Sequence, residues 1–273
     1  MTSTLADPRF GTVPLATGVR LRHREQGDPH GDVIVFVHGW PDSWYSFSRV
    51  LSLLPQRHHA YAVDLRGFGG SERPAGGYGI DDLAADVVAL LDAVGARRAT
   101  LVGHSMGTFV VRRAARLAPE RVDRLVLIGS AHTTVNPVMQ EVREQIIDLP
   151  DPVPVAFAEE FQAGTVHGRL PQAFFDGIVA ESAALPARIW RATFDGILAF
   201  DDTAELGRIT TPTLVLWGEH DALFDREQQQ RLVSALPDAR LLVYPDTGHC
   251  PNWEQPHRVV ADLDAFVSSG GAR

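Results

Sequence analysis

Two hydrophobic patterns alternate along most of this chain. Short continuous apolar runs rich in β-branched residues, such as 33–37, are typical of strands buried on both faces. Between them lie segments with apolar residues at helical spacing, such as 81–94, where Asp81 is the expected N-terminal cap. Strands that alternate with helices in this way predict an α/β fold with a mostly parallel sheet flanked by helices.

The alternation stops after residue 131 and resumes at residue 209. Residues 132–208 contain no buried-strand run and instead carry aromatic-rich helical patterns. We therefore expect a core formed by 1–131 and 209–273, with 132–208 inserted as a helical cap, or lid. The expected strands are 13–15, 19–25, 33–37, 59–63, 99–102, 122–128, 213–217 and 240–244, and the expected helices are 43–54, 81–94, 108–118, 138–149, 155–163, 171–185, 187–200, 226–236 and 255–267.

Composition and charge exclude several classes of partner. The apolar and charged fractions, 45% and 22%, are those of an ordinary globular protein. A formal net charge of −9 argues against a nucleic-acid or anionic-membrane partner. No run of about eighteen apolar residues could span a membrane, and the first ten residues lack a secretory pattern, so we expect a cytoplasmic protein. The single cysteine, Cys250, excludes an internal disulfide. A homodimer is left open.

Residue types also limit the chemistry. All 25 basic residues are arginine, which excludes Schiff-base catalysis and a Ser-Lys pair. The glycine-rich stretch 64–71 has no helix directly after it, so we interpret it as a turn and not as a dinucleotide site. No histidine pair has metal-ligand spacing, and we expect neither a metal nor a cofactor. The histidines considered are His58, His59, His132, His167 and His220.

The pentapeptide Gly103-His104-Ser105-Met106-Gly107 lies between an expected strand and an expected helix. A serine at the tip of such a sharp turn needs neighbours without bulk two residues on either side, and glycine meets that need. The turn also places Ser105 at a helix N-terminus, where backbone N–H groups favour negative charge. The motif alone can occur by chance, so its interpretation as a nucleophile site depends on the rest of the chain.

A serine nucleophile needs a base, and the base needs a partner that fixes its tautomer. Open parallel sheets present functional residues at the carboxyl ends of their strands. Directly after three expected strands come Ser105, the pair Glu219 and Asp221, and finally His249. The order Ser, Asp, His is the order of the triad in α/β hydrolases.

The chain resembles the α/β-hydrolase fold family, specifically esterase-like and lactonase-like serine hydrolases with a helical cap. The resemblance rests on HGWPDSW (38–44), DLRGFGGS (64–71), GHSMG (103–107), GEHD (218–221) and GHCPNWEQP (248–256). It implies a catalytic triad with Ser105 as nucleophile, Asp221 as orienting acid and His249 as general base. Glu219 and Asp225 compete for the acid role, but the family pattern G-x-x-D selects Asp221.

The same resemblance implies an oxyanion hole and a substrate pocket. The oxyanion hole would consist of the backbone N–H groups of Trp40 and Met106, which stabilise a tetrahedral oxyanion. The pocket would lie between cap and core. Its expected substrate-binding side chains are Trp40, Phe157, Phe161, Trp190 and Phe194.

Three other conspicuous side chains have a simpler interpretation. His38 and His104 lie in tight glycine turns, where we expect them to hydrogen-bond to the backbone. Cys250 follows His249, and we interpret it as a small packed thiol and not as a nucleophile.

HGWPDSW is reminiscent of epoxide hydrolases and haloalkane dehalogenases, which attack with an aspartate. Position 105 is serine, and 132–208 contains no tyrosine to protonate an epoxide. We therefore expect a hydrolase that cleaves a small-molecule carboxylic ester or lactone that is hydrophobic and could be aromatic. Three alternatives stay open: a C–C bond hydrolase using Arg188 or Arg191 to bind a carboxylate, a cofactor-free perhydrolase, and a ligand receptor.

Overall fold

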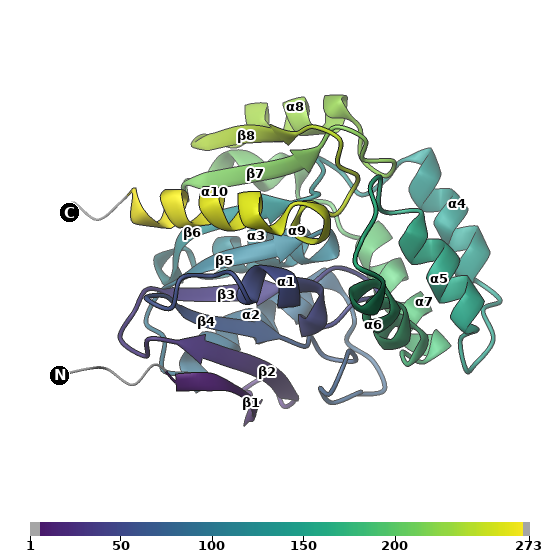
Figure 1. Ribbon diagram of the computed structural model, residues 1–273, viewed down its shortest axis with the longest axis horizontal. Helices are drawn as coiled ribbons and strands as arrows, with labels where there is room; N and C mark the ends of the chain where they lie inside the picture. The colour runs from purple at the N-terminus through teal and green to yellow at the C-terminus, as the bar shows by residue number, and fades with distance from the viewer. Residues whose placement is uncertain (1–5, 270–273) are drawn as a thin grey trace.

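An eight-stranded sheet forms the centre of residues 6–269, the part of the chain that the computed structural model describes (Figure 1). The strand order is β1-β2-β4-β3-β5-β6-β7-β8. The pairs β1–β2 and β2–β4 are antiparallel and every other pair is parallel. This confirms the predicted α/β class. The strands are β1 Ala6–Pro14, β2 Arg20–Gly27, β3 Val33–Val37, β4 His59–Val63, β5 Ala99–His104, β6 Val122–Ile128, β7 Thr213–Gly218 and β8 Ala239–Tyr244.

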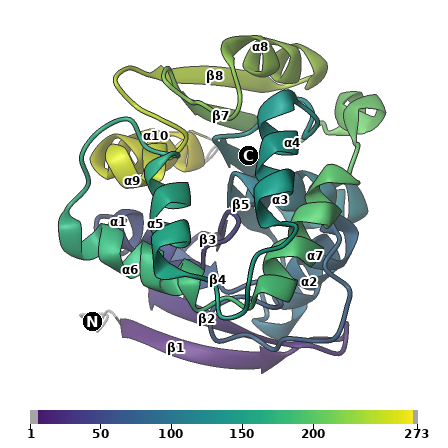
Figure 2. The same ribbon diagram turned by 90° about the vertical axis from the view of Figure 1, so that its right-hand side faces the viewer.

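Helices cover both faces of the sheet, with α1 and α10 on one face and α2 and α3 on the other (Figure 2). Alternate residues of β3 face opposite sides: Ile34 and Phe36 pack with α1 and α10, whereas Val35 and Val37 pack with α2 and α3. The buried apolar runs thus follow from burial on two faces. The helices outside the connection between β6 and β7 are η1 Trp44–Phe47, α1 Ser48–Leu51, α2 Ile80–Ala93, α3 Met106–Leu117, η2 Pro119–Arg121, α8 Arg226–Ala235, α9 Pro251–Glu254 and α10 Pro256–Ser268.

Four further α-helices and a short 3₁₀ helix connect β6 to β7. In this segment α4 packs on α7 and α5 packs on α6, so the four helices form two pairs side by side (Figure 2). They lie beyond one end of the sheet, past the carboxyl ends of its parallel strands (Figure 1). We refer to them as the α4–α7 segment. The helices are α4 Pro137–Ile146, α5 Val155–Ala163, α6 Gln172–Ala183, α7 Ala187–Leu198 and η3 Thr203–Arg208.

Two local predictions are wrong. Asp81 is not the N-cap of α2, because the helix begins at Ile80 with Gly79 as the N-cap residue. The Gly79 N–H instead donates to the carboxylate of Asp82 at 3.2 Å, inside the first turn. The single helix expected over 43–54 is divided into the 3₁₀ helix η1 and the short α1.

No helix within 6–269 is long and apolar enough to cross a membrane.

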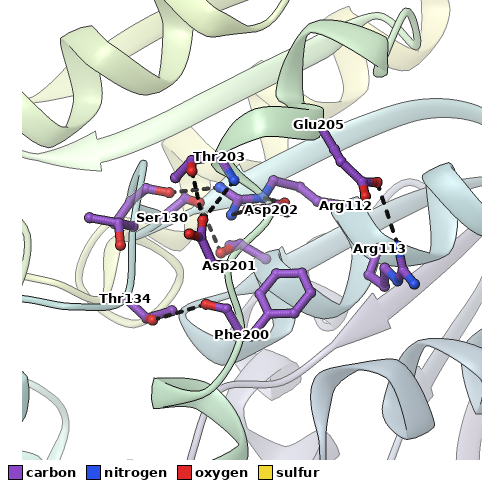
Figure 3. Close-up of polar contacts among 12 residues, drawn as sticks. Arg112, Arg113, Ser130, Thr134, Phe200, Asp201, Asp202, Thr203 and Glu205 are labelled. Atoms are coloured by element: carbon purple, nitrogen blue, oxygen red, sulfur yellow. Dashed lines mark hydrogen bonds and ion pairs between the residues drawn. The ribbon is translucent and has the colours of Figure 1, made fainter.

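One buried arginine connects α3, the helix that follows Ser105, to both ends of the α4–α7 segment. Arg112 on α3 is completely buried and donates to both carboxylate oxygens of Asp202, at 2.7 and 3.1 Å. It also donates to the backbone carbonyl of Ala131 at 2.6 Å. Asp202 follows α7 and Ala131 precedes α4, so a single guanidinium holds the two chain connections together (Figure 3).

We expect Arg112→Ala to lower the free energy of unfolding by about 3–5 kcal/mol, because it leaves the Asp202 carboxylate buried without its partner. Urea unfolding followed by tryptophan fluorescence measures the change. The neighbouring Arg113→Ala is a matched control. Arg113 pairs with Glu205 (Figure 3) and with Asp81 at the surface, and these pairs should contribute about 1 kcal/mol or less. Equal effects of the two substitutions would contradict this account.

Candidate active site

Ser105 occupies the turn between β5 and α3 with a backbone conformation that residues other than glycine rarely adopt. Its φ is 50° and its ψ is −119°. Among residues 6–269 only Asp246 shares a positive φ without being glycine. The turn is held by the Ser105 N–H, which donates to the carbonyl of Ile128 at 2.9 Å. Thr108 binds the Ser105 carbonyl through both its N–H and its hydroxyl, at 2.8 and 2.7 Å.

The two flanking glycines are required by close backbone packing. A Cβ atom on Gly103 would lie 2.4 Å from the carbonyl oxygen of Gly107. A Cβ atom on Gly107 would lie 2.2 Å from the carbonyl oxygen of Val37 on the neighbouring strand β3. Any side chain at either position would therefore clash with backbone that cannot yield, and the glycine requirement predicted from the motif is confirmed.

Asp221 and His249 come from the loops after β7 and β8 and lie in contact. Nδ1 of His249 is 2.9 Å from Oδ2 of Asp221, and both side chains are buried. The other oxygen, Oδ1, accepts the N–H groups of Leu223 and Phe224 at 2.9 and 3.1 Å. Because a carboxylate only accepts, the proton of a neutral His249 lies on Nδ1 and the lone pair on Nε2.

His249 Nε2 is buried and has no hydrogen-bond partner among the described residues. Ser105 and His249 line the same cavity, but no hydrogen bond joins the Ser105 hydroxyl to Nε2 in the described chain. A longer separation is common in enzymes without bound substrate. The structure thus brings together all three side chains predicted as nucleophile, acid and base. Within the described range 6–269, the hydrogen bond between Asp221 and His249 is formed, and the one between Ser105 and His249 is not.

The two backbone N–H groups predicted as an oxyanion hole flank the same turn. Met106 is the first residue of α3, and Trp40 follows the His38-Gly39 turn after β3. Within the described part of the chain neither N–H donates to a protein acceptor. The side chains of both residues line the cavity that contains Ser105.

The cavity around Ser105 is narrow and mostly apolar. Its open volume is about 30 Å³, and α4, α5 and α7 close it on the side away from the sheet. A wider outer cavity of about 530 Å³ adjoins it and shares four lining residues with it. The shared residues are Val142, Phe161, Thr165 and Leu223.

The five aromatic side chains predicted to bind substrate divide into three groups. Trp40, Phe161 and Phe194 line the inner cavity, with the Phe161 and Phe194 rings 5.1 and 4.6 Å from the Trp40 ring. Phe157 lines only the outer cavity. Trp190 is fully buried and lines neither; its backbone carbonyl accepts the Trp40 indole N–H at 3.1 Å.

A buried polar group next to Ser105 was not predicted as part of the site. Asp42 lies within HGWPDSW and lines the cavity; its carboxylate accepts the side-chain amide of Gln162 from α5 at 3.0 Å. Nδ1 of His104 is 3.7 Å from the same carboxylate. The position of Asp42 in the motif was a signal, but nothing in the sequence pointed to Gln162.

The remaining histidines and the cysteine next to Ser105 have different environments. His38 hydrogen-bonds to the backbone as expected: its ring donates to the Gly39 carbonyl and accepts the Leu65 N–H. Burial lowers the pKa of His38 to about 4. His104 differs from the prediction, because neither ring nitrogen has a hydrogen-bond partner among the described residues; burial lowers its pKa too. Cys250 is buried, contacts Thr165, and burial raises the pKa of its thiol.

Comparison with known proteins agrees with this architecture. The sequence model of the alpha/beta hydrolase fold matches residues 32–256. A non-heme chloroperoxidase of Streptomyces lividans is 32% identical over 95% of this chain and 100% of its own length. Epoxide hydrolase A of Mycobacterium tuberculosis is 45% identical, over 38% of this chain and 34% of its own length.

A solved structure is similar over nearly the whole chain. The esterase RhEst1 from Rhodococcus sp. ECU1013 superimposes with a TM-score of 0.84 at 25% identity, covering 95% of this chain and 98% of its own. The match of the family model, the full-length relative and the sheet topology lead to the same conclusion. This chain belongs to the α/β-hydrolase fold family.

Proposed function

We propose that this protein is a serine hydrolase that cleaves a neutral, hydrophobic carboxylic ester or lactone. The observation that carries the proposal is that Ser105 and the unpartnered Nε2 of His249 line one apolar cavity, with Asp221 fixing the imidazole from behind. A nucleophile, a base and an orienting acid in this order are what acyl transfer to water requires.

In this mechanism Ser105 Oγ attacks the carbonyl carbon while Nε2 of His249 removes the hydroxyl proton. The N–H groups of Trp40 and Met106 stabilise the resulting oxyanion. The intermediate collapses to an acyl-enzyme, and the leaving alcohol oxygen takes the proton from His249. Water then attacks the acyl-enzyme and loses its proton to Nε2. The bond between the acyl carbon and Ser105 Oγ breaks, Oγ takes the proton back from His249, and the acid product leaves. Asp221 stays ionised and stabilises the transient imidazolium.

The polar groups that line the cavity favour binding of a neutral substrate over an anionic one. The buried Asp42 carboxylate lines the cavity next to Ser105, and none of the described lining residues is an arginine. Arg188 and Arg191, considered above for binding a substrate carboxylate, donate instead to backbone carbonyls of Pro74 and Leu149. A C–C bond hydrolase acting on an acidic ring-cleavage product therefore has little support.

We further propose that residues 132–208 act as the cap of the site. The inner cavity is small, and Val142 on α4 and Phe161 on α5 line both the inner and the outer cavity, so we expect an ester to reach Ser105 between α4 and α5. The outer cavity has room for a larger acyl or alcohol group. Phe157, Phe161 and Leu223 form its apolar part, which favours an apolar group there, and Gln145 and Glu160 form its polar part.

Perhydrolysis is the second candidate, and the full-length similarity to a non-heme chloroperoxidase favours it. It would use the same acyl-enzyme, attacked by hydrogen peroxide in place of water to release a peracid. Epoxide hydrolysis would need a carboxylate at position 105, where this chain has serine.

We expect Ser105→Ala to reduce kcat/KM for ester hydrolysis by about 10⁴- to 10⁶-fold while the protein stays folded. The substrates are a short aryl ester, a long-chain aryl ester and an aromatic macrolactone, each assayed with water alone and with added peroxide. The short ester should react fastest, because the inner cavity is small. Peracid formation that exceeds hydrolysis would favour perhydrolysis instead.

The control for this substitution is Ser52→Ala, at an exposed serine that does not line either cavity. Its kcat/KM and unfolding midpoint should match those of the wild type. A Ser105→Ala variant that keeps activity within tenfold of the wild type would place the nucleophile elsewhere.

Asp42→Asn should relax discrimination against anionic substrates. Asparagine can still accept the Gln162 amide, but the repulsion of a substrate carboxylate is lost. For a neutral aryl ester and its carboxylate-bearing analogue, we expect the ratio of kcat/KM values to shift by about tenfold toward the anionic ester, equivalent to about 1.4 kcal/mol. Asp176→Asn, at an exposed position on α6, serves as the control. An unchanged ratio in Asp42→Asn would refute the role given to this carboxylate.

A further inference from the structure

Two imidazoles and a carboxylate converge on the surface outside the cavity. His167, His220 and Asp246 each offer one ligand atom, and these three atoms lie within 4.8 Å of one another. His167 belongs to the loop after α5, His220 to the loop after β7, and Asp246 to the loop after β8. All three residues are exposed, and none of them lines the inner or the outer cavity.

The side chains of this group have no other role in the described structure. The two imidazole rings stack with their centroids 3.9 Å apart and their planes 12° from parallel. Among the hydrogen bonds of residues 6–269, none involves either ring or the Asp246 carboxylate. Rotation about the side-chain bonds can therefore turn the ring planes to converge on a shared ligand without breaking a hydrogen bond.

The backbones that carry the three side chains are already fixed to one another. The His220 N–H donates to the carbonyl of Thr247 at 2.9 Å, which ties the β7 loop to the residue after Asp246. The His249 N–H donates to the carbonyl of Thr165 at 2.8 Å, and the His167 N–H donates to Glu254 at 3.0 Å. The loops thus hold the ligand set in place, and only side chains need to move for binding.

The donor set selects the class of ion. Neutral imidazole nitrogens with one carboxylate suit zinc and the neighbouring first-row transition metals, whereas magnesium and calcium prefer oxygen ligands. Three protein ligands leave at least one position for water. Each ligand comes from a different loop, so an ion here would connect segments that are far apart in the sequence.

We propose that His167, His220 and Asp246 bind one divalent first-row transition-metal ion of the zinc class. The ion joins the loop after α5 to the two loops that carry Asp221 and His249, since His220 directly precedes Asp221 and Asp246 lies three residues before His249. Because the site lies outside the cavity, the ion restrains these loops and takes no part in the reaction. The proposal does not depend on which ester is cleaved.

The test is titration of tag-free, EDTA-treated protein with Zn²⁺ alone, by calorimetry and by competition with a chromogenic chelator. We expect one ion per chain in the wild type, lost in the double variant His167→Ala/His220→Ala. Asp246→Asn should weaken binding by about 10–100-fold. Asparagine tolerates the positive φ of Asp246, so this variant keeps the backbone in place. The three side chains are exposed, and the variants should fold like the wild type.

The matched control is His30→Ala, which removes an exposed histidine between β2 and β3 and should bind zinc like the wild type. Zinc should also raise the unfolding midpoint of the wild type and of His30→Ala, but not that of the double variant. A wild type that binds no zinc would overturn the proposal. So would binding that survives in the double variant, or binding of Ca²⁺ as tight as that of Zn²⁺.

Discussion

The turn at Ser105 depends on the contact between the backbone of Gly107 and the carbonyl of Val37. Only a glycine can come this close, because a Cβ atom would approach the carbonyl oxygen to 2.2 Å. The contact allows α3 to begin directly over β3 and forces the chain to reverse within one residue. The positive φ of Ser105 costs on the order of 1–3 kcal/mol. Hydrogen bonds to Ile128 and Thr108 on both sides of the turn offset this cost and hold the hydroxyl at the cavity.

Helix α3, which begins at this turn, also contacts the α4–α7 segment. Arg112 lies two helical turns after Ser105 on α3 and binds Asp202 and the Ala131 carbonyl, next to the two ends of the α4–α7 segment. A displacement of α3 would therefore move the serine and both connections together. This makes the position of the segment relative to Ser105 a property of one rigid element, and not of flexible linkers.

The features that could be predicted from the sequence are those with a local signal. Strands buried on both faces produce apolar runs, and β4 and β6 begin and end where the pattern places them. Residues after strand ends necessarily meet at one edge of the sheet, which is why the positions of Ser105, Asp221 and His249 could be inferred. The start of α2 was misjudged because Asp82 caps it from within the first turn, which the order of residues does not reveal.

Features that depend on distant segments left no such signal. Asp42 and Gln162 are 120 residues apart and meet only because α5 packs over the turn after β3. Ligand spacing along the sequence is a local criterion, so it could not bring together His167, His220 and Asp246, which come from three separate loops. For the same reason, composition identified the aromatic character of 132–208 but could not separate Phe161, at the cavity, from Trp190, behind Trp40.

The helices of the α4–α7 segment are paired, and the boundary between the two pairs lies over the cavities. Because α4 packs on α7 and α5 on α6, the boundary between the two pairs runs between α4 and α5, and residues of both helices line both cavities. Arg112 restrains the ends of the segment at α4 and α7, and the α5 side contacts the core through the hydrogen bonds from His249 to Thr165 and from Gln162 to Asp42. Separation of the two pairs along this boundary would change the contacts of α5 with the core. One of these contacts is the hydrogen bond from the His249 N–H to Thr165, so the arrangement of the segment and the position of His249, the proposed base, are coupled.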